Sequence, residues 1–305
     1  MKKTVFIGSV LSSRVALETL IENDISIDLV CSLDESASKN VSDYYPIHEI
    51  AKKNNIPYIK FKKINSQDVL ERIRQVRPDF IFVIGLSQII SQELLNLAKE
   101  YAIGFHPTPL PKYRGRAAIP WQIILGIRES KVSLFKLDQG MDSGDIICQF
   151  PYYIDETDYA MDVYKKVCDA MRCALKLSIP QIYGGTVKFI KQDHEEATYL
   201  LARKPEDGLI DWNLSGKEIE TLIRATSKPY PGAFSFYNDS KVIFWKAKLE
   251  ENEKFIGIPG QIAWIKDSGE IGVVTKDSLL LVYDYEIVNN DIKFIVGHKF
   301  KSPVV

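Results

Sequence analysis

Short apolar runs alternate with helical patterns through the first hundred or so residues of the chain. The expected strands lie at residues 4–7, 27–33, 57–61 and 80–84. Between them, apolar residues recur at spacings of three and four, as they do on the buried face of a helix. The expected helices lie at residues 14–21, 47–54 and 66–77. Strands that alternate with helices of this length predict an α/β protein with a Rossmann-like, doubly wound and mostly parallel sheet.

The middle of the chain, residues 102–149, places a strand, a proline-rich turn and an acidic loop in succession. An apolar strand at 102–105 ends at His106, and the following segment is too rich in proline and glycine to continue as helix or central strand. After a short apolar helix, a second strand at 132–138 runs into a glycine-rich acidic loop. Ligands of open α/β sheets bind outside the carboxyl ends of the strands, so this stretch is expected to hold the functional site.

A long helix and then a change of pattern divide the chain. The helix is predicted over residues 158–178, and Pro180 is expected to end it. In the polar stretch that follows we expect a boundary between domains at residues 1–203 and 204–305. One helix is predicted at 216–226, and short strands with hairpin turns then predict a small OB-like β-barrel. These strands are expected at residues 233–237, 242–247, 260–264, 271–275, 279–283 and 294–296.

Composition and charge exclude several classes of protein. With 46% hydrophobic residues, 26% charged residues and a net charge of −1, nothing attracts the whole chain to nucleic acid or anionic membranes. No apolar run approaches the ~20 residues of a membrane span, and the first residues do not read as a signal peptide. The four cysteines fall within apolar patterns, without the pairing of metal ligands. We therefore expect a cytoplasmic protein with free thiols and no metal.

His106 is the first candidate for chemistry because of its position at the end of an apolar strand. Histidine changes charge near neutral pH, which suits it to proton transfer. An orienting carboxylate is expected in the acidic loop, where spacing alone ranks Asp138, Asp142 and Asp145 equally. The turn at residues 8–13 retains only the first glycine of the dinucleotide fingerprint, which disfavours a dinucleotide site.

Residues 104–145 read GFHPTPLPKYRGRAAIPW and then, after a gap, VSLFKLDQGMDSGD. This segment resembles the signature of the 10-formyltetrahydrofolate-dependent formyltransferases, Asn-X-His-Pro-Ser-Leu-Leu-Pro-X-Tyr-Arg-Gly followed by Asp-X-Gly-X-Asp-Thr-Gly-Asp. The stretches at 211–212 and 229–235 resemble the barrel entry of the two-domain members. The sequence of residues 112–117, KYRGRA, is most similar to that of sugar N-formyltransferases such as the one acting on UDP-4-amino-4-deoxy-L-arabinose.

The resemblance implies roles for individual residues. His106 falls on the family's catalytic base and Asp142 on the aspartate that orients it, so that an amine can attack the formyl carbon of 10-formyltetrahydrofolate. The implied folate-binding residues are Leu86, Ser87, Gln88, Ile89, Ile90, Leu137, Asp138 and Gly140. The implied residues on the acceptor side are Thr108, Lys112, Tyr113, Arg114 and Arg116. Arginine there suits phosphate or pyrophosphate.

Gly104 departs from the family's pattern. The family's asparagine at this position shares in stabilising the oxyanion, a contribution of about 3–4 kcal/mol for a good donor. Glycine has no side-chain donor, so the backbone N–H of Gly104, or Gln88 or Thr108, is expected to substitute. The alternative is a folate-binding module with impaired catalysis.

Two acceptors are compatible with the resemblance: the amine of a nucleotide-linked amino sugar, and the amine of methionyl-tRNA. Residues 206–305 contain 12 Lys and Arg against 15 Asp and Glu, a net charge of −3. Binding a polyanion requires clustered basic residues, so nucleic acid is disfavoured. We therefore expect an amino-sugar N-formyltransferase, with methionyl-tRNA formyltransferase as the alternative. Apolar strands in the C-terminal domain allow a homodimer but do not require one.

Overall fold

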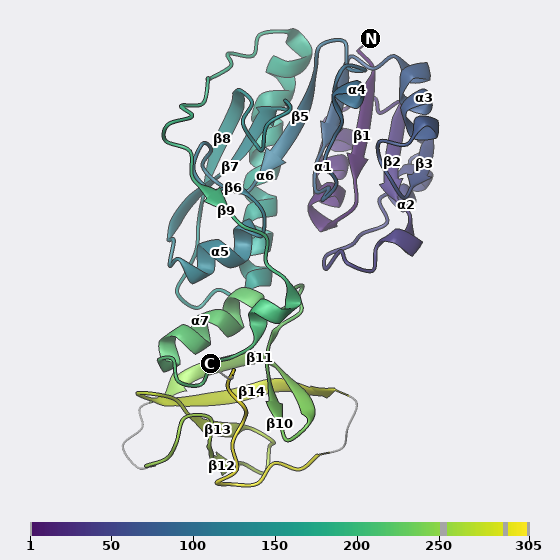
Figure 1. The fold of residues 1–305 in the computed structure, drawn as a ribbon. Coiled ribbons are helices and arrows are strands. Elements are labelled where there is room, and N and C mark those ends of the chain that lie inside the picture. Colours follow the sequence, from purple (N-terminus) through teal and green to yellow (C-terminus); the bar gives the residue numbers. More distant parts are fainter. Residues whose placement is uncertain (1, 251–254, 289–291, 304–305) are drawn as a thin grey trace. The chain divides into compact units, whose positions relative to one another are not determined.

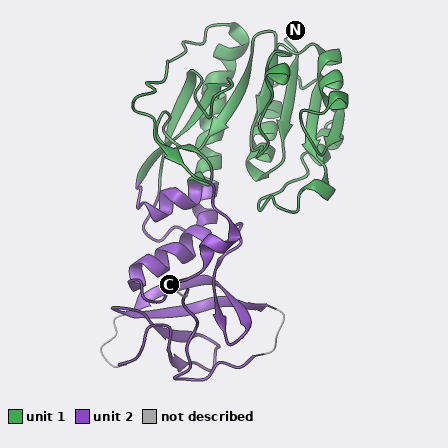
Figure 2. Ribbon diagram, viewed as in Figure 1, with its two compact units in different colours: residues 1–118, 129–153, 165–201 green, residues 119–128, 154–164, 202–305 purple. Residues whose placement is uncertain are grey.

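The computed structural model describes residues 2–250, 255–288 and 292–303 (Figure 1). Contacts group the chain into two compact units (Figure 2). The first consists of residues 1–118, 129–153 and 165–201, and the second of residues 119–128, 154–164 and 202–305. The second unit therefore includes two short segments that precede the expected domain boundary. Among the described residues, no helix is long and apolar enough to cross a membrane.

The first unit is built on a seven-stranded sheet with the strand order β3-β2-β1-β4-β5-β7-β8. The strands are β1 Thr4–Gly8, β2 Leu29–Leu33, β3 Tyr58–Phe61, β4 Phe80–Val83, β5 Tyr101–His106, β7 Glu129–Lys136 and β8 Ile146–Tyr153. The first five are parallel, whereas β7 is antiparallel to both β5 and β8. This arrangement confirms the predicted doubly wound, mostly parallel sheet.

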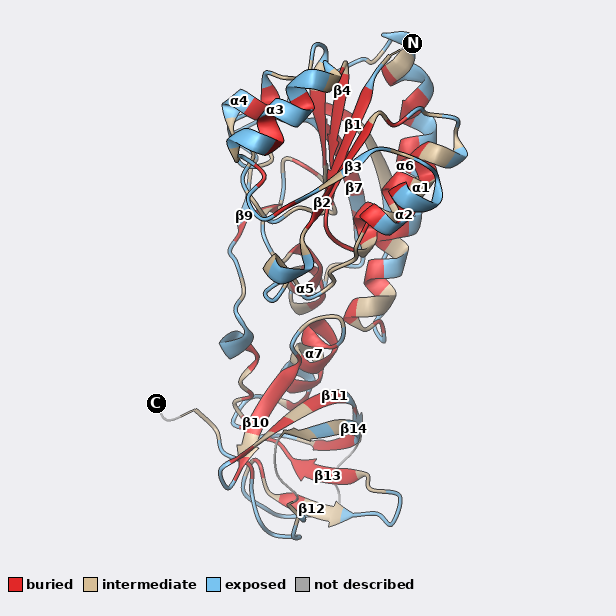
Figure 3. Ribbon diagram, turned by 90° about the vertical axis from the view of Figure 1, so that its right-hand side faces the viewer, coloured by how far each residue is buried: buried red, intermediate tan, exposed pale blue. Residues whose placement is uncertain are grey.

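Helices cover both faces of this sheet. They are α1 Leu11–Glu22, α2 His48–Lys53, α3 Gln67–Val76, α4 Gln92–Leu95 and α6 Ala160–Gly184, with a 3-10 turn at Glu35–Ala37, whereas nearly all of α5 Ala118–Ile124 belongs to the second unit. Figure 3 shows α3 and α4 on one side of the strands and α1 and α6 on the other, with buried residues facing inward. Every residue of β1 and β4 is buried, as expected for parallel strands packed on both faces.

The prediction that Pro180 ends the long helix is wrong, because α6 continues past it. Ile179 and Ile182 are buried in the core, and the Tyr183 hydroxyl lies 2.6 Å from Thr4 Oγ1. Pro180 itself is exposed, so it lies on the solvent side of the helix, where water can reach the carbonyl that lacks a helical partner. Packing of the last turns therefore outweighs the local preference of proline.

The second unit contains a five-stranded antiparallel sheet with the order β10-β11-β14-β13-β12. Its elements are η2 Pro205–Gly208, α7 Gly216–Thr226, β10 Ala233–Tyr237, β11 Ser240–Glu250, β12 Ile262–Ile265, β13 Ile271–Val274 and β14 Leu279–Val288. Lys301 bridges Phe236 in β10, and Lys299 bridges Gln261 just before β12. The segment 299–301 thus connects both edges of the sheet, which confirms the predicted barrel-like form.

The strand expected at residues 294–296 is absent, since these residues are irregular. Phe294 instead packs its ring 5.1 Å from that of Tyr237 and 5.4 Å from that of Tyr285. Ile295 and Val296 are 52% and 56% exposed, so only Phe294 of this apolar run packs inward, and it does so without strand pairing.

Candidate active site

His106 ends β5 with its side chain directed into a buried position. The residue is 6% exposed, and Nε2 lies 2.8 Å from the backbone oxygen of Tyr113. A carbonyl oxygen can only accept a hydrogen bond, so Nε2 carries the hydrogen. In the neutral ring the basic nitrogen is therefore Nδ1.

Asp142 is the carboxylate that the structure brings to this nitrogen. Its Oδ2 lies 3.7 Å from His106 Nδ1, a distance for charge interaction and longer than a hydrogen bond. The same Oδ2 accepts a hydrogen bond of 2.8 Å from the backbone N–H of Gly115. Asp142 thus flanks the basic nitrogen, while the Tyr113 carbonyl holds the ring from its other side.

The other candidates in the loop have different surroundings. Asp138 is exposed, and its Oδ1 accepts hydrogen bonds from Gly140 N at 3.0 Å and Ser143 Oγ at 2.7 Å. Asp138 and Gly140 thus lie together in a turn of the acidic loop. Within the described part of the chain, no group of three or more His, Cys, Asp or Glu is placed to hold a metal ion.

Gly104 lies beneath two apolar side chains. A Cβ atom at this position would be 2.7 Å from Leu137 Cδ2 and 2.9 Å from Phe135 Cζ. Phe135 is 1% exposed and packs in a small apolar cluster with Leu110 and Ile146. The space that a side chain at position 104 would need is therefore already filled.

Two residues expected to replace the missing oxyanion donor are already engaged in local hydrogen bonds. Thr108 is fully buried, and its hydroxyl donates to the backbone oxygens of Lys112 at 3.0 Å and Tyr113 at 3.2 Å. Gln88 donates to Lys62 O and accepts from Ile64 N, both at 2.8 Å. The role of a substitute donor stays a prediction for both residues and for the backbone of Gly104.

The two walls expected for folate share one apolar cluster. Leu86 and Ile90, which follow β4, and Leu137, which follows β7, all pack against the same core of the first unit. Ile89 is 87% exposed, and Ser87 is exposed as well. The segment therefore presents apolar surface beside the acidic loop, which fits a flat, largely apolar ring system.

The basic turn divides into exposed and buried cations. Lys112 and Arg116 are exposed, and Tyr113 is partly exposed. Arg114 is 2% exposed, and its guanidinium donates to Gln192 Oε1 at 2.7 and 3.2 Å. Lys112 and Arg116 are thus open to a charged acceptor, whereas Arg114 points into the protein.

Residues 190–200, which the sequence pattern described only as polar and irregular, hold this turn in place. We call this segment the strap. Its β9 strand, Tyr199–Leu200, pairs in parallel with β6, Arg114–Gly115. Tyr113 N also donates to Thr198 Oγ1 at 2.8 Å. Hydrophobic periodicity did not predict a functional role for the strap, because it lies in a polar stretch without a helix or strand pattern.

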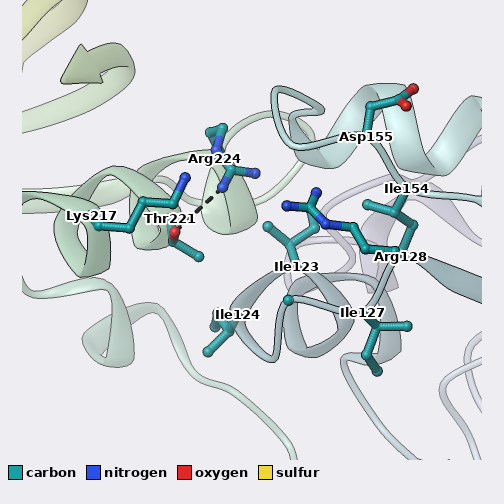
Figure 4. A pocket seen from close by; sticks show the side chains of 10 residues that line it. Ile123, Ile124, Ile127, Arg128, Ile154, Asp155, Lys217, Thr221 and Arg224 are labelled. Atoms are coloured by element: carbon teal, nitrogen blue, oxygen red, sulfur yellow. Dashed lines mark hydrogen bonds between the residues drawn. The ribbon is translucent and has the colours of Figure 1, made fainter.

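A pocket of about 90 Å³ in the second unit contains none of the expected site residues (Figure 4). Its cations are already paired with carboxylates, Arg128 with Glu156 and both Lys217 and Arg224 with Glu220. The pocket has no lining residue in common with the constellation around His106.

The sequence matches the model of the formyl transferase family over residues 2–178 and that of the formyl transferase C-terminal domain over residues 203–292. The chain therefore belongs to the formyl transferase family, a family of formyl-transferring enzymes. This membership confirms the resemblance seen in the sequence.

Two curated relatives differ in how much of their length the chain covers. It is 33% identical over 236 residues to the bifunctional polymyxin resistance protein ArnA of Wigglesworthia glossinidia brevipalpis, covering 77% of this chain and only 36% of that protein. It is 30% identical over 305 residues to the methionyl-tRNA formyltransferase of Clostridioides difficile (strain 630), covering 99% of this chain and 97% of that protein.

Solved structures share the fold. One is WlaRD, a sugar 3N-formyl transferase in the presence of dTDP and 5-N-formyl-THF, with a TM-score of 0.65, 22% identity, and coverage of 95% of this chain and 99% of that chain. Another is the methionyl-tRNA formyltransferase from Clostridium thermocellum, with a TM-score of 0.62, 21% identity, and coverage of 90% and 100%.

Proposed function

We propose that this protein transfers a formyl group from 10-formyltetrahydrofolate to the primary amine of a nucleotide-linked amino sugar. The observation that carries the proposal is the pairing of His106 with Asp142. Nε2 is tied to the Tyr113 carbonyl, and Nδ1 lies 3.7 Å from Asp142 Oδ2. A base nitrogen next to a carboxylate is what removal of a proton from an attacking amine requires.

In the proposed mechanism His106 Nδ1 takes the proton of the amine that attacks the formyl carbon, and it returns this proton to N10 of the folate as the bond between that nitrogen and the formyl carbon breaks. Asp142 stabilises the resulting imidazolium by its charge, and the Tyr113 carbonyl keeps the ring oriented throughout. General base catalysis of this kind contributes about 10²–10⁴-fold to the rate. When bound, 10-formyltetrahydrofolate supplies the electrophilic carbon, and Leu86, Ile90 and Leu137 would hold its ring system.

Charge and similarity support a nucleotide-linked sugar as the acceptor. The exposed Lys112 and Arg116 lie on the basic turn, where they suit a diphosphate. Residues 206–305 have a net charge of −3, which is poorly suited to a polyanion. Among proteins of the same fold, the N-formyltransferase from Helicobacter canadensis was solved with folinic acid and dTDP-3-aminofucose.

Methionyl-tRNA formyltransferase is the second candidate, and one specific observation favours it. The Clostridioides difficile methionyl-tRNA formyltransferase is matched over 97% of its length, whereas the ArnA relative is matched over 36%. The two candidates differ in the acceptor and share the chemistry of His106.

The test is an acceptor panel. Purified protein and 10-formyltetrahydrofolate are mixed with nucleotide-linked amino sugars or with charged initiator tRNA, and tetrahydrofolate release is followed. We expect turnover with a sugar, and turnover with the tRNA alone would contradict the choice of acceptor.

His106→Ala should abolish turnover while changing folate affinity by less than about threefold. His298→Ala, a histidine of the second unit bonded to Tyr237, is the matched control. Folate binding without turnover on any amine would support the impaired module instead.

A further inference from the structure

Gln192 connects the basic turn to the acidic loop through both ends of its amide. Nε2 donates to the backbone oxygens of Asp142 at 2.9 Å and Gly144 at 2.6 Å. Oε1 accepts from Arg114 Nε at 3.2 Å and Nη2 at 2.7 Å. The residue is 6% exposed, and its two amide hydrogens and its oxygen are all used in these hydrogen bonds.

The strap that carries Gln192 is anchored independently of this side chain. Ile190 exchanges two backbone hydrogen bonds with Ile146, at 2.8 and 2.9 Å. Farther along, Arg114 N donates to Thr198 O at 2.9 Å, and Arg116 N donates to Leu200 O at 3.0 Å. Removal of the Gln192 amide therefore leaves the strap attached at both ends.

Asp142 needs such support because of its backbone conformation. Its φ is +49°, in the left-handed region that residues with a side chain adopt less readily than glycine. Gln192 holds the Asp142 carbonyl, and Gly115 N holds its carboxylate at 2.8 Å. The first contact holds the backbone of Asp142, and the second holds its side chain.

Arg114 strengthens this connection. Its guanidinium is buried, and the structure gives it neutral acceptors, namely Gln192 Oε1, the Tyr199 hydroxyl at 3.3 Å and His194 Nδ1 at 3.1 Å. Within the described residues, no carboxylate lies within 4.0 Å of it. A buried cation that donates two hydrogen bonds to an amide oxygen polarises that amide. The N–H groups of the amide then donate more strongly.

We propose that Gln192, polarised by Arg114, is a positioning residue that holds Asp142 beside His106. The inference rests on the proposed function, in which Asp142 stabilises the imidazolium of His106. Gln192 lies between the two matched family segments, which end at residue 178 and begin at residue 203. It acts on the reaction only through Asp142.

Two substitutions separate the bonds made by Gln192. Gln192→Leu removes all of them, whereas Gln192→Glu keeps an acceptor for Arg114 and loses both donors. We expect both variants to lower kcat by roughly tenfold to hundredfold, as small displacements of catalytic groups do, with KM for 10-formyltetrahydrofolate changed less than about threefold. Gln261→Leu is the control, since Gln261 likewise accepts from Ile258 N at 2.7 Å and donates to Gly297 O at 3.0 Å.

Hydrogen exchange gives a readout that does not depend on turnover. The Gly115 amide, bonded to Asp142 Oδ2, should exchange at least about tenfold faster in both Gln192 variants, because the carboxylate is released. The Ile190 amide, bonded to Ile146 O, should be unchanged. Equal acceleration at both amides, or at neither, would overturn the inference, since Gln192 would then be merely structural or dispensable. A further outcome is that the wild-type protein shows no formyl transfer to any acceptor, while the Gln192 variants show faster exchange at Gly115 alone. That pair of results would reject the proposed function and support the role of Gln192 in positioning Asp142.

Discussion

Gly104 shows how one residue constrains the site, because the strand that ends in His106 can carry no side chain there. Leu137 Cδ2 and Phe135 Cζ would lie 2.7 and 2.9 Å from an added Cβ. Phe135 is buried within its cluster and cannot move away, whereas Leu137 is partly exposed. Leu137 and Phe135 therefore occupy the space that an asparagine side chain at position 104 would need.

We predict that Gly104→Ala lowers the free energy of unfolding by about 1–3 kcal/mol, the usual effect of overpacking a core. Leu137→Ala in the same chain should recover part of this loss, because it removes the nearest contact. Urea unfolding of the single and double variants measures the coupling. Gly184→Ala is the control, since its nearest neighbour would be 3.9 Å away. A stable Gly104→Ala, or purely additive effects, would contradict the prediction.

At the scale of single residues the sequence predicted part of the candidate site. His106 was found from its position after an apolar strand, while spacing left three carboxylates equal, and only the family resemblance selected Asp142. The buried state of Arg114 could not be predicted, because an arginine in a proline-rich turn reads as solvated. Gln192 could not be predicted either, since its role depends on the distant Asp142 and Arg114.

At the scale of elements, the direction of β7 explains why the site was difficult to predict. The expectation that ligands gather at carboxyl ends holds for parallel strands. Because β7 is antiparallel to β5, its Lys136 pairs with Ile103, and His106 pairs with Ser133 nearer the start of β7. The loop after β7 therefore leaves the sheet away from His106 and must fold back to bring Asp142 within 3.7 Å. Hydrophobic periodicity predicted the strands but does not report their direction.

Helix α7 was predicted with its observed bounds, and its start carries a capping box that favours this first residue. Ser215 caps the helix by accepting from Glu218 N at 3.2 Å, and the Glu218 carboxylate accepts from the Ser215 hydroxyl and, at 2.9 Å, from its N–H. These hydrogen bonds from Ser215, the hydroxyl first, hold the pKa of Glu218 below its ordinary value of 4.5. A lowered carboxyl pKa in the folded state means that ionised Glu218 stabilises the protein.

This stabilisation is expected to depend on pH in one direction. It is complete above the unfolded pKa of about 4.5 and is lost as the pH falls through the lower folded value. The difference in Tm between wild type and Glu218→Gln should therefore be constant from pH 7 to about pH 5 and shrink in more acidic solution. Ser215→Ala should weaken this pH dependence and lower stability by about 1 kcal/mol through loss of the cap. A difference in Tm independent of pH would contradict the assignment.

At the scale of the whole molecule, the compact units do not follow a single cut in the sequence. Residues 119–128 and 154–164 belong with the C-terminal sheet, although the chain places them among elements of the first unit. The sequence pattern predicted the boundary from the polar stretch near residue 204. It contains no signal that two earlier segments belong to the second unit. The reason lies in contacts far apart in sequence, of which Tyr159 makes the clearest.

Tyr159 completes an open edge of the C-terminal sheet. β10 pairs with β11 only as far as Phe244, and three residues later Ala247 offers its N–H and C=O to the Tyr159 hydroxyl, at 3.2 and 2.9 Å. Ala247 is 2% exposed, so water cannot replace these bonds. Burial raises the pKa of the Tyr159 phenol, which keeps the hydroxyl protonated as a donor.

We therefore predict that Tyr159→Phe lowers the free energy of unfolding of the second unit by about 1–3 kcal/mol, since it leaves a buried donor and acceptor unpaired. Amide exchange should accelerate at Ala247 and along β11 and β14, and remain unchanged in β1 and β4 of the first unit. Tyr153→Phe is the control, because Tyr153 is 63% exposed. A chain that begins at residue 204 lacks Tyr159 altogether and should show the same local loss. If that shorter chain protects Ala247 as well as the full chain does, the segment 154–164 is not needed to complete the sheet.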